Sequence, residues 1–134
     1  MNPVDLGFTE AIAKGDVAVV MAFVDSGVVD VNTPDRDGDI PLQTAAKKDR
    51  LAVLEQLLAY GAHINAADAR GWTALHEAAL IGSDDIVRTL LKYGADKSLR
   101  NEDGQSALDL AVQFGHAPIV FVLCDGHSVQ TGFY

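Results

Sequence analysis

Residues 68–82 read DARGWTALHEAALIG, and this stretch decides the fold. Alanines and leucines recur at helical spacing between residues 72 and 80, Thr73 stands where it can cap a helix, and Gly82 interrupts the run. Ser83 then begins a second helix, whose apolar residues share one face and which ends at Gly94. We therefore expect a helix, a turn, a second helix and an extended loop.

The same arrangement recurs along the chain at a fixed step of 33 residues. The segment before residue 34 joins the series with a shift of one residue. Four units result, at about 1–34, 35–67, 68–100 and 101–134, and they form a single domain without a linker. One unit alone cannot bury its apolar face, whereas four stacked units can. The residues that set the step are Gly38, Gly71 and Gly104, then Leu42, Leu75 and Leu108, then Ala45, Ala78 and Ala111.

The stretch 68–82, together with the run LLKYGAD at residues 90–96, resembles the ankyrin repeat. The pattern of that family is D-x-x-G-x-T-P-L-H-x-A-A-x-x-G, followed by two leucines and G-A-D. The resemblance covers nearly the whole chain. It implies an all-α ankyrin-repeat solenoid of four stacked helix-turn-helix repeats with short β-hairpin loops. These motifs are highly specific for the fold and poorly specific for function.

Three departures from the pattern predict local differences. The T-P-L-H turn appears as IPLQ at residues 40–43, TALH at 73–76 and SALD at 106–109. Only His76 therefore keeps the histidine that, in the family, usually makes hydrogen bonds between loops. Asp49 replaces the glycine between the helices of the second unit, and we expect it in a left-handed backbone conformation. The first unit lacks the loop motif, as an N-terminal capping unit can.

Composition and charge exclude several classes of function. The chain has 134 residues, of which 49% are hydrophobic, and its net charge of −9 disfavours nucleic acid and anionic membranes as partners. Its one cysteine cannot form an internal disulfide, and no apolar run approaches the ~18 residues of a membrane span. The first ten residues contain no Lys or Arg, unlike a signal peptide. We expect an intracellular protein of the cytoplasm, with the nucleus as a second compartment.

The sequence contains no complete catalytic or cofactor motif. His76-Glu-Ala-Ala-Leu80 approaches the zinc-protease motif H-E-x-x-H, but Leu80 replaces the second histidine, so a structural histidine is favoured. Cys124 takes the second position of the paired leucines, and we expect it in the core rather than as a nucleophile. Phosphate-binding loops and dinucleotide fingerprints are also missing. We therefore expect no enzymatic activity, no cofactor and no metal site.

The family resemblance implies that the chain binds another protein through its loop tips and the concave surface of the first helices. Four apolar residues stand out there, because they occupy positions that the fold does not need for its core: Trp72, Leu80, Ile81 and Phe114. A purely stabilising role is the alternative. The full set of candidate protein-binding residues is Arg36, Asp39, Lys47, Lys48, Arg70, Trp72, Leu80, Ile81, Arg100, Asp103, Gln105 and Phe114.

Charge is distributed unevenly over the four units. Their net charges are −4, −1, 0 and −4 in chain order, and nine of the ten bases lie in the two middle units. We therefore expect a locally basic concave centre that favours a partner segment with acidic and apolar residues. An ordinary mixture of solvated charges is the alternative. The bases at candidate binding positions are Arg36, Lys47, Lys48, Arg70 and Arg100.

The ends of the chain and two asparagines leave further alternatives. The second helices of the first and last units, at 17–24 and 118–124, are apolar where a capping repeat is usually polar. We favour a tail, residues 128–134 with Phe133 and Tyr134, that folds back over the last helix. End-to-end self-association of an otherwise monomeric protein is the rival. Asn65 and Asn32 resemble family asparagines that oxygenases hydroxylate, so a hydroxylase substrate and an inhibitory or regulatory subunit of a larger enzyme stay open as functions.

Overall fold

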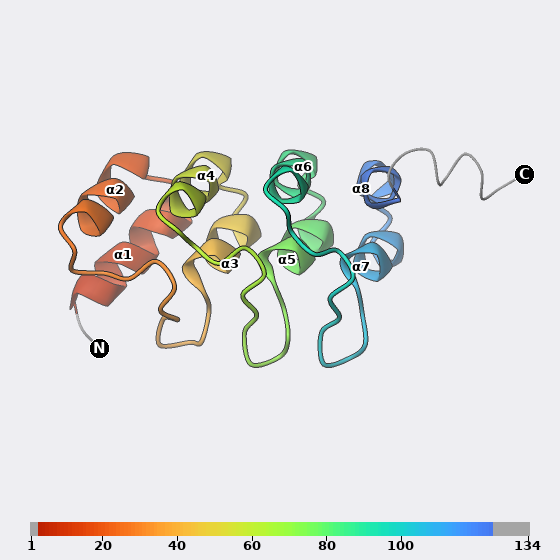
Figure 1. Ribbon diagram of the computed structural model, residues 1–134, viewed down its shortest axis with the longest axis horizontal. Helices are drawn as coiled ribbons and strands as arrows, with labels where there is room; N and C mark the ends of the chain where they lie inside the picture. Colours follow the sequence, from red (N-terminus) through yellow and green to blue (C-terminus); the bar gives the residue numbers. More distant parts are fainter. Residues whose placement is uncertain (1–2, 125–134) are drawn as a thin grey trace, which may run out of the picture.

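The computed structural model describes residues 3–124, which form eight helices in two rows (Figure 1). One row holds the inner helices α1, α3, α5 and α7, and the other holds the outer helices α2, α4, α6 and α8. This arrangement confirms the predicted all-α solenoid of four helix pairs. In that part of the chain, no helix has the length and apolar character needed to cross a membrane. The helices are α1 (Pro3–Lys14), α2 (Val17–Asp25), α3 (Pro41–Lys47), α4 (Leu51–Ala59), α5 (Ala74–Ile81), α6 (Asp84–Lys92), α7 (Ala107–Gln113) and α8 (Ala117–Leu123).

Local side chains fix where the helices begin and end. The hydroxyl of Thr73 accepts a hydrogen bond from the backbone N–H of His76 at 3.3 Å, so the predicted cap of α5 is confirmed. Ser106 caps α7 in the same way. Gly82 ends α5 with a φ of 81°, and Asp49 has a φ of 59°, which is the left-handed conformation predicted for it.

The residues just before α4 and α8 tie their repeats to the preceding ones. Arg50 donates through Nε to the carbonyl oxygen of Ala13 at 2.9 Å. His116, two repeats later, places Nε2 at 2.8 Å from the carbonyl oxygen of Leu80. Both acceptors lie in the last turn of the preceding inner helix, where carbonyl groups have no partner within their own helix. The repeats are thus joined by specific polar contacts as well as by apolar packing.

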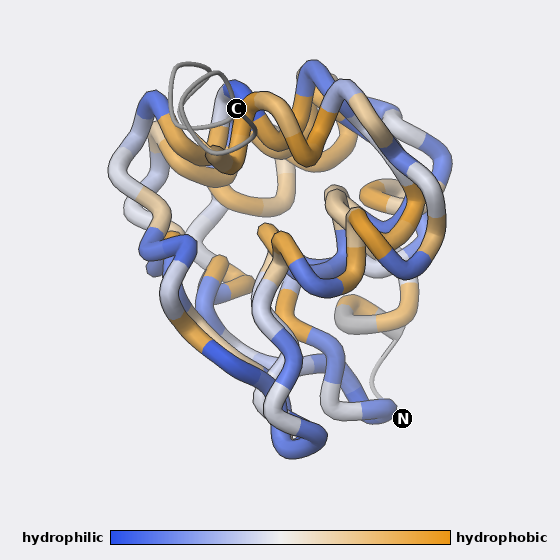
Figure 2. The backbone as a smooth tube through the Cα atoms, turned by 90° about the vertical axis from the view of Figure 1, so that its right-hand side faces the viewer, coloured by the Kyte–Doolittle hydropathy of each residue, from blue (hydrophilic) through white to orange (hydrophobic). Residues whose placement is uncertain are grey.

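The loops between helix pairs are tight turns, each organised by one carboxylate or amide. Asp35, Asp68 and Asn101 recur at the same position, and Oδ1 of each accepts two backbone N–H groups of its own loop at 2.8–3.0 Å. The loops project beyond the inner helices and have hydrophilic tips (Figure 2). No strand occurs within residues 3–124, because the backbone hydrogen bonds close turns and build no ladder. The predicted β-hairpins are therefore present as turns only.

The core is a row of interfaces between neighbouring repeats. Ala46 of α3 and Ala79 of α5 are completely buried, because the next inner helix packs on each of them. Val112 of α7 takes the equivalent position, and with no further repeat described beyond it, its side chain is 61% exposed. An apolar groove over Val112, Val120 and Phe121 marks this end of the stack.

Two predictions concern the C-terminal end. Cys124, which we expected in the core, is only half-buried. The second position of the leucine pair lies at the edge of the core in every repeat, since Leu58 and Leu91 are also only partly buried. The predicted fold-back of residues 128–134, including Phe133 and Tyr134, lies outside the described residues.

Candidate functional site

Three pairs of side chains form a row across the concave face, by which we mean the surface formed by the loops and the inner helices. Lys47 Nζ lies 3.2 Å from the Asp39 carboxylate, and two repeats later the side-chain amide of Gln105 donates to Gln113 at 3.0 Å. The row therefore runs from a charged pair to an amide pair. The repeat between them has an apolar pair at the same two positions: Trp72 and Leu80.

Neighbouring side chains hold Trp72 in place. The guanidinium carbon of Arg70 lies 5.5 Å from the centroid of its ring, and the His76 ring lies 5.8 Å away between centroids, at an interplanar angle of 53°. The Trp72 ring is half-buried and packs against the core. Our expectation that the fold does not need this residue for its core is therefore wrong, because the ring is part of the packing between loop and helix. Its role in binding stays a prediction.

Ile81 and Phe114 are the exposed apolar residues of the predicted site. Ile81 ends α5 and is 38% exposed, and Phe114 takes the equivalent position after α7 and is 50% exposed. Leu80, beside Ile81, is half-buried. Equivalent positions of adjacent repeats are neighbours in a stack. These residues therefore form an apolar edge along the concave face.

A buried amide joins the second and third repeats beside this row. Nε2 of Gln43 donates to the carboxylates of Asp68 and Glu77, in both cases at 2.8 Å, and Arg70 Nη2 lies 2.9 Å from Asp68. Burial works against ionisation of Asp68, but the hydrogen bonds from Gln43, Arg70 and the loop backbone outweigh it and lower its pKa to about 2. Burial raises the pKa of Glu77, and the Gln43 bond opposes that change. The cluster fixes α3 relative to α5 and to the loop that precedes α5.

His76 makes the hydrogen bond between loops that the resemblance implies. Its Nε2 lies 3.0 Å from the carbonyl oxygen of Gln105 in the next loop, and its Nδ1 accepts from the backbone N–H of Thr73 at 3.2 Å. With Nδ1 as an acceptor, the proton is on Nε2. Burial lowers the pKa of His76, which keeps the ring neutral. Among residues 3–124, no three His, Cys, Asp or Glu side chains converge where they could hold a metal ion.

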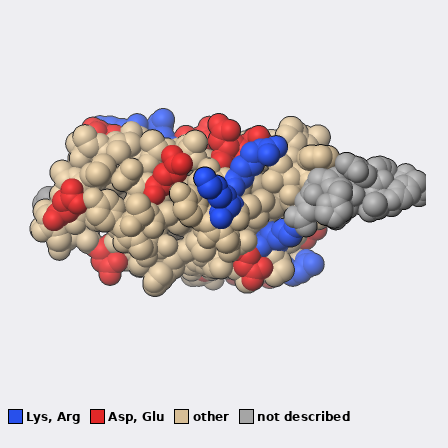
Figure 3. All heavy atoms as spheres, turned by 45° about the horizontal axis from the view of Figure 1, so that its top comes forward, with Lys and Arg blue, Asp and Glu red and all other residues tan. Residues whose placement is uncertain are grey.

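Acidic partners reduce the positive charge expected at the centre of the concave face. Lys47 and Arg70 are paired as described above, and Arg100 Nη1 lies 3.3 Å from the Asp109 carboxylate of α7. Arg36 and Lys48 are exposed and have no ion pair with any described residue. Basic side chains also lie on the outer-helix side, as Figure 3 shows. The local excess of positive charge is therefore smaller than the number of bases predicts.

Comparison with known proteins identifies the repeats. A family model described as "Ankyrin repeats (3 copies)" matches residues 66–132, and one described as "Ankyrin repeats (many copies)" matches residues 24–78. The chain belongs to the ankyrin-repeat family. Ankyrin repeats typically bind proteins and are generally non-catalytic.

A curated relative shares part of this ankyrin array. The palmitoyltransferase AKR1 of Naumovozyma castellii is 43% identical over 67 residues, which make up 49% of this chain and 9% of that protein. The chain therefore spans less than a tenth of the length of the relative that it matches. Because the matched part consists of repeats, the likeness concerns the ankyrin fold.

The two asparagines that resemble hydroxylation sites connect successive ankyrin repeats. Oδ1 of Asn32 accepts from the backbone N–H of His63, and Oδ1 of Asn65 accepts from that of Asp96, each at 2.8 Å. Each side chain thus satisfies a donor in the following loop. Hydroxylation of either residue stays a prediction, and an oxygenase has to reach the side chain past this bond.

The Gln43, Asp68 and Glu77 cluster is part of the site that sequence reasoning missed. Gln43 stands at the position of the ankyrin histidine, and Glu77 follows His76 inside an otherwise small and apolar helix. The available signal was that Gln43 and Glu77 are both polar: Gln43 is the repeat equivalent of His76, and Glu77 is the residue after His76 in the next repeat. The sequence alone does not show that a carboxylate at Glu77 is buried against an amide one repeat away.

Proposed function

We propose that this chain is a non-catalytic module that binds another protein through the concave face of its ankyrin repeats. The observation that carries the proposal is the apolar edge of Ile81 and Phe114, with Leu80 beside it. Hydrogen bonds between repeats hold this edge on a preformed surface, so binding requires little ordering on this side. Exposed apolar groups surrounded by polar pairs are typical of a binding hot spot.

The partner segment that suits this face carries apolar and acidic residues. Ile81 and Phe114 offer apolar contacts, while Lys48 takes the same repeat position one unit earlier and, like Arg36, has no ion pair among the described residues. A partner carboxylate near these bases adds charge complementarity, which speeds association more than it strengthens the complex. Because both bases are exposed, apolar burial supplies most of the affinity.

The test compares two variants of the full chain as immobilised bait. Ile81→Ser combined with Phe114→Ser removes the apolar edge, and Tyr93→Ser, at an aromatic residue of the outer row that is 53% exposed, is the matched control. We expect proteins captured by the wild-type chain to be captured by the control and to be reduced at least about tenfold with the double variant. Both variants should melt within a few degrees of the wild type, because all three side chains are exposed.

Two outcomes contradict the proposal. Equal capture by the double variant shows that the apolar edge is not the contact surface. Loss of capture by Tyr93→Ser to the same extent shows that the binding is non-specific. If capture does not weaken between low and moderate ionic strength, the partner is not acidic, but the apolar edge can still be the contact surface. Trp72 is left unchanged, since its ring also supports the fold.

A further inference from the structure

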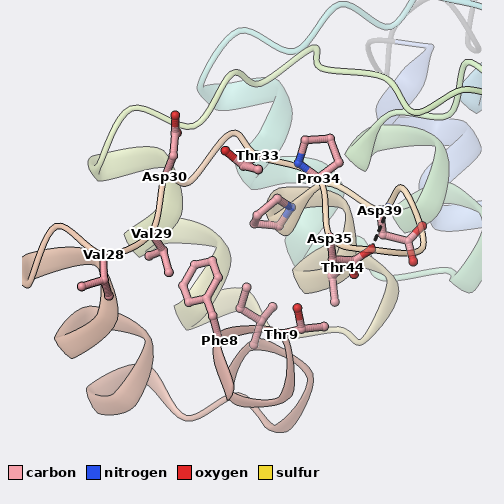
Figure 4. A pocket seen from close by; sticks show the side chains of 12 residues that line it. Phe8, Thr9, Val28, Val29, Asp30, Thr33, Pro34, Asp35, Asp39 and Thr44 are labelled. Atoms are coloured by element: carbon pink, nitrogen blue, oxygen red, sulfur yellow. Dashed lines mark hydrogen bonds between the residues drawn. The ribbon is translucent and has the colours of Figure 1, made fainter. Parts of the chain in front are cut away.

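A cavity of about 270 Å³ lies between α1, α3 and the chain that joins the first two repeats (Figure 4). Phe8 and Thr9 of α1 face the loop residues Thr33 and Pro34 across it. Val28, which is exposed, is also part of its lining. The complete lining is Phe8, Thr9, Ile12, Val28, Val29, Asp30, Thr33, Pro34, Asp35, Asp39, Pro41 and Thr44.

The next pair of repeats shows what fills this place elsewhere. There the amide of Gln43 and the guanidinium of Arg70 both donate to Oδ2 of Asp68, at 2.8 and 2.9 Å, and Gln43 also donates to Glu77. N–H donors from two side chains therefore close the gap between the inner helices and the loop. A carboxylate at this loop position is well supplied with donors.

Between the first and second repeats both of these donors are missing. Thr9 occupies the position of Gln43 and is too short to bridge the repeats, and Asp37 occupies the position of Arg70. Asp35, the equivalent of Asp68, receives two backbone N–H groups at Oδ1. Its Oδ2 has no hydrogen-bond donor among the described residues. The cavity lies where these donors are missing, and Asp39 stands there at the position that Trp72 takes in the next repeat pair.

A second acceptor faces the same space. Thr44, the equivalent of Glu77, is only 7% exposed and lines the cavity. Its hydroxyl makes no hydrogen bond with a described residue and is reached by solvent, because no fully buried polar side-chain atom among the described residues lacks a partner. Asp30 and Asp39 also line the cavity, and no Lys or Arg does, although Oδ2 of Asp39 is paired with Lys47 at 3.2 Å. Apolar side chains, Phe8 and Pro34 among them, form a further part of its wall.

We propose that this cavity binds an arginine side chain of a partner protein. The guanidinium supplies the donors that Gln43 and Arg70 supply in the next repeat pair, and its fixed fork can reach Oδ2 of Asp35 and a second oxygen of the lining. The aliphatic stem then lies on the apolar wall beside Phe8 and Pro34. The proposal rests on the proposed function in that the arginine belongs to a protein partner. It adds, in the first two repeats, a second contact point, where the partner supplies the cation.

The test uses a small probe and the full chain, without any partner. Wild-type protein labelled with ¹⁵N is titrated with N-acetyl-arginine amide and, separately, with the neutral isostere N-acetyl-citrulline amide. We expect the arginine probe to bind with a Kd on the order of 1 mM and to shift the backbone amide signals of Thr9, Asp35 and Thr44. The citrulline probe should shift them at least about fivefold less, because it lacks the charge that pairs with a carboxylate.

Two variants make the test specific to the cavity. Asp35→Asn removes the charge and keeps the loop, since Asn101 accepts the same two backbone bonds in the fourth repeat. It should abolish the shifts, whereas Asp85→Asn, an exposed acid of α6, should leave them unchanged. Thr9→Gln combined with Asp37→Arg restores the missing donors and should both exclude the probe and raise the melting temperature.

The outcomes separate this proposal from the proposed function. Equal shifts with citrulline, shifts that survive Asp35→Asn, or no shifts at millimolar probe each overturn the arginine site and say nothing about the apolar edge. Conversely, the Ile81→Ser and Phe114→Ser variant can fail to affect capture while the cavity still binds the probe. Failure of the Thr9→Gln, Asp37→Arg variant to fold leaves the Asp35→Asn result decisive.

Discussion

Asp68→Asn should destabilise the protein strongly at neutral pH, and its effect should decrease in acid. In the wild type, Oδ2 of Asp68 accepts from Gln43 and Arg70. An amide nitrogen in its place faces two donors and accepts from neither. A pKa lowered from 3.8 to about 2 corresponds to about 2.5 kcal/mol of stability at pH 7, and we expect a loss of that size.

The direction of the pH dependence follows from the lowered pKa. The folded state holds the Asp68 proton less tightly than the unfolded state, so the stabilisation is fully present above pH 3.8 and is lost as pH falls toward about 2. By pH 3 the contribution should be about half of its value at pH 7. Urea unfolding of the wild type and the variant at pH 7, 5, 4 and 3 measures the difference directly.

Asp35→Asn is the matched control for this experiment. Asp35 makes the same two backbone hydrogen bonds as Asp68 but lacks the side-chain donors, so we expect its substitution to cost less than about 0.5 kcal/mol. Two results refute the reasoning: a cost for Asp68→Asn as small as that of Asp35→Asn, or a cost that stays constant from pH 7 to pH 3. Either result means that Gln43 and Arg70 do not stabilise the carboxylate.

Three further predictions concern packing and titration. Gly71→Ala should lower the free energy of unfolding by at least about 2 kcal/mol, because a Cβ there lies 3.0–3.3 Å from the backbone of the next loop. Gly104→Ala is the control: Gly104 has a similar positive φ but open space around it, so the loss should be about 1 kcal/mol. Thermal or urea unfolding measures both. His76→Gln should flatten the stability profile between pH 7 and 5: the lowered pKa of His76 means that the unfolded state binds its proton first, so the wild type loses stability as pH falls below 6.5. A profile with unchanged slope contradicts this. Ala79→Ser should lower the free energy of unfolding by about 1–3 kcal/mol, and Val112→Ser by less than about 0.5 kcal/mol, because another repeat covers only Ala79. Equal losses of stability would show that Val112, at the end of the stack, is covered too.

The fold was predictable because the same local chemistry occurs several times in one chain. Thr73 and Gly82 mark the ends of α5, and the repetition of the pattern at 33 residues shows that the marks are not accidental. Asp49 was predictable for the same reason, since its repeat equivalents Gly15, Gly82 and Gly115 all have positive φ. A residue type that is weak evidence for a helix end in one repeat becomes strong evidence when the same position has it in several repeats.

The site was predictable only where it depends on position within a repeat. Ile81 and Phe114 are exposed as expected, because their positions lie outside the core of every unit. Trp72 and Cys124 differ from expectation because burial depends on the neighbours that a side chain meets, and the repeat pattern specifies only the backbone position. The charge of the concave centre was overestimated because a count of bases ignores the carboxylates that pair with them in the folded chain, as Asp109 pairs with Arg100.

The cavity beside Asp35 was not predicted, although part of its signal is present in the sequence. Aligning the first two units with a shift of one residue places Thr9 opposite Gln43 and shows that a long polar side chain has been replaced by a short one. What the alignment cannot show is that Gln43 bridges two carboxylates. The consequence of losing that bridge becomes visible only when both repeat pairs are compared in space.

The contacts between repeats have a mechanical consequence. The major helix contacts join only neighbouring repeats, and the hydrogen bond from Arg50 to Ala13 spans 37 residues, little more than one unit. A force applied to the two ends is therefore transmitted through the interfaces in series, and each interface carries the full load. We expect the chain to extend in steps of one repeat, starting at the interface between the first and second repeats, where no polar bridge like that of Gln43 reinforces the packing.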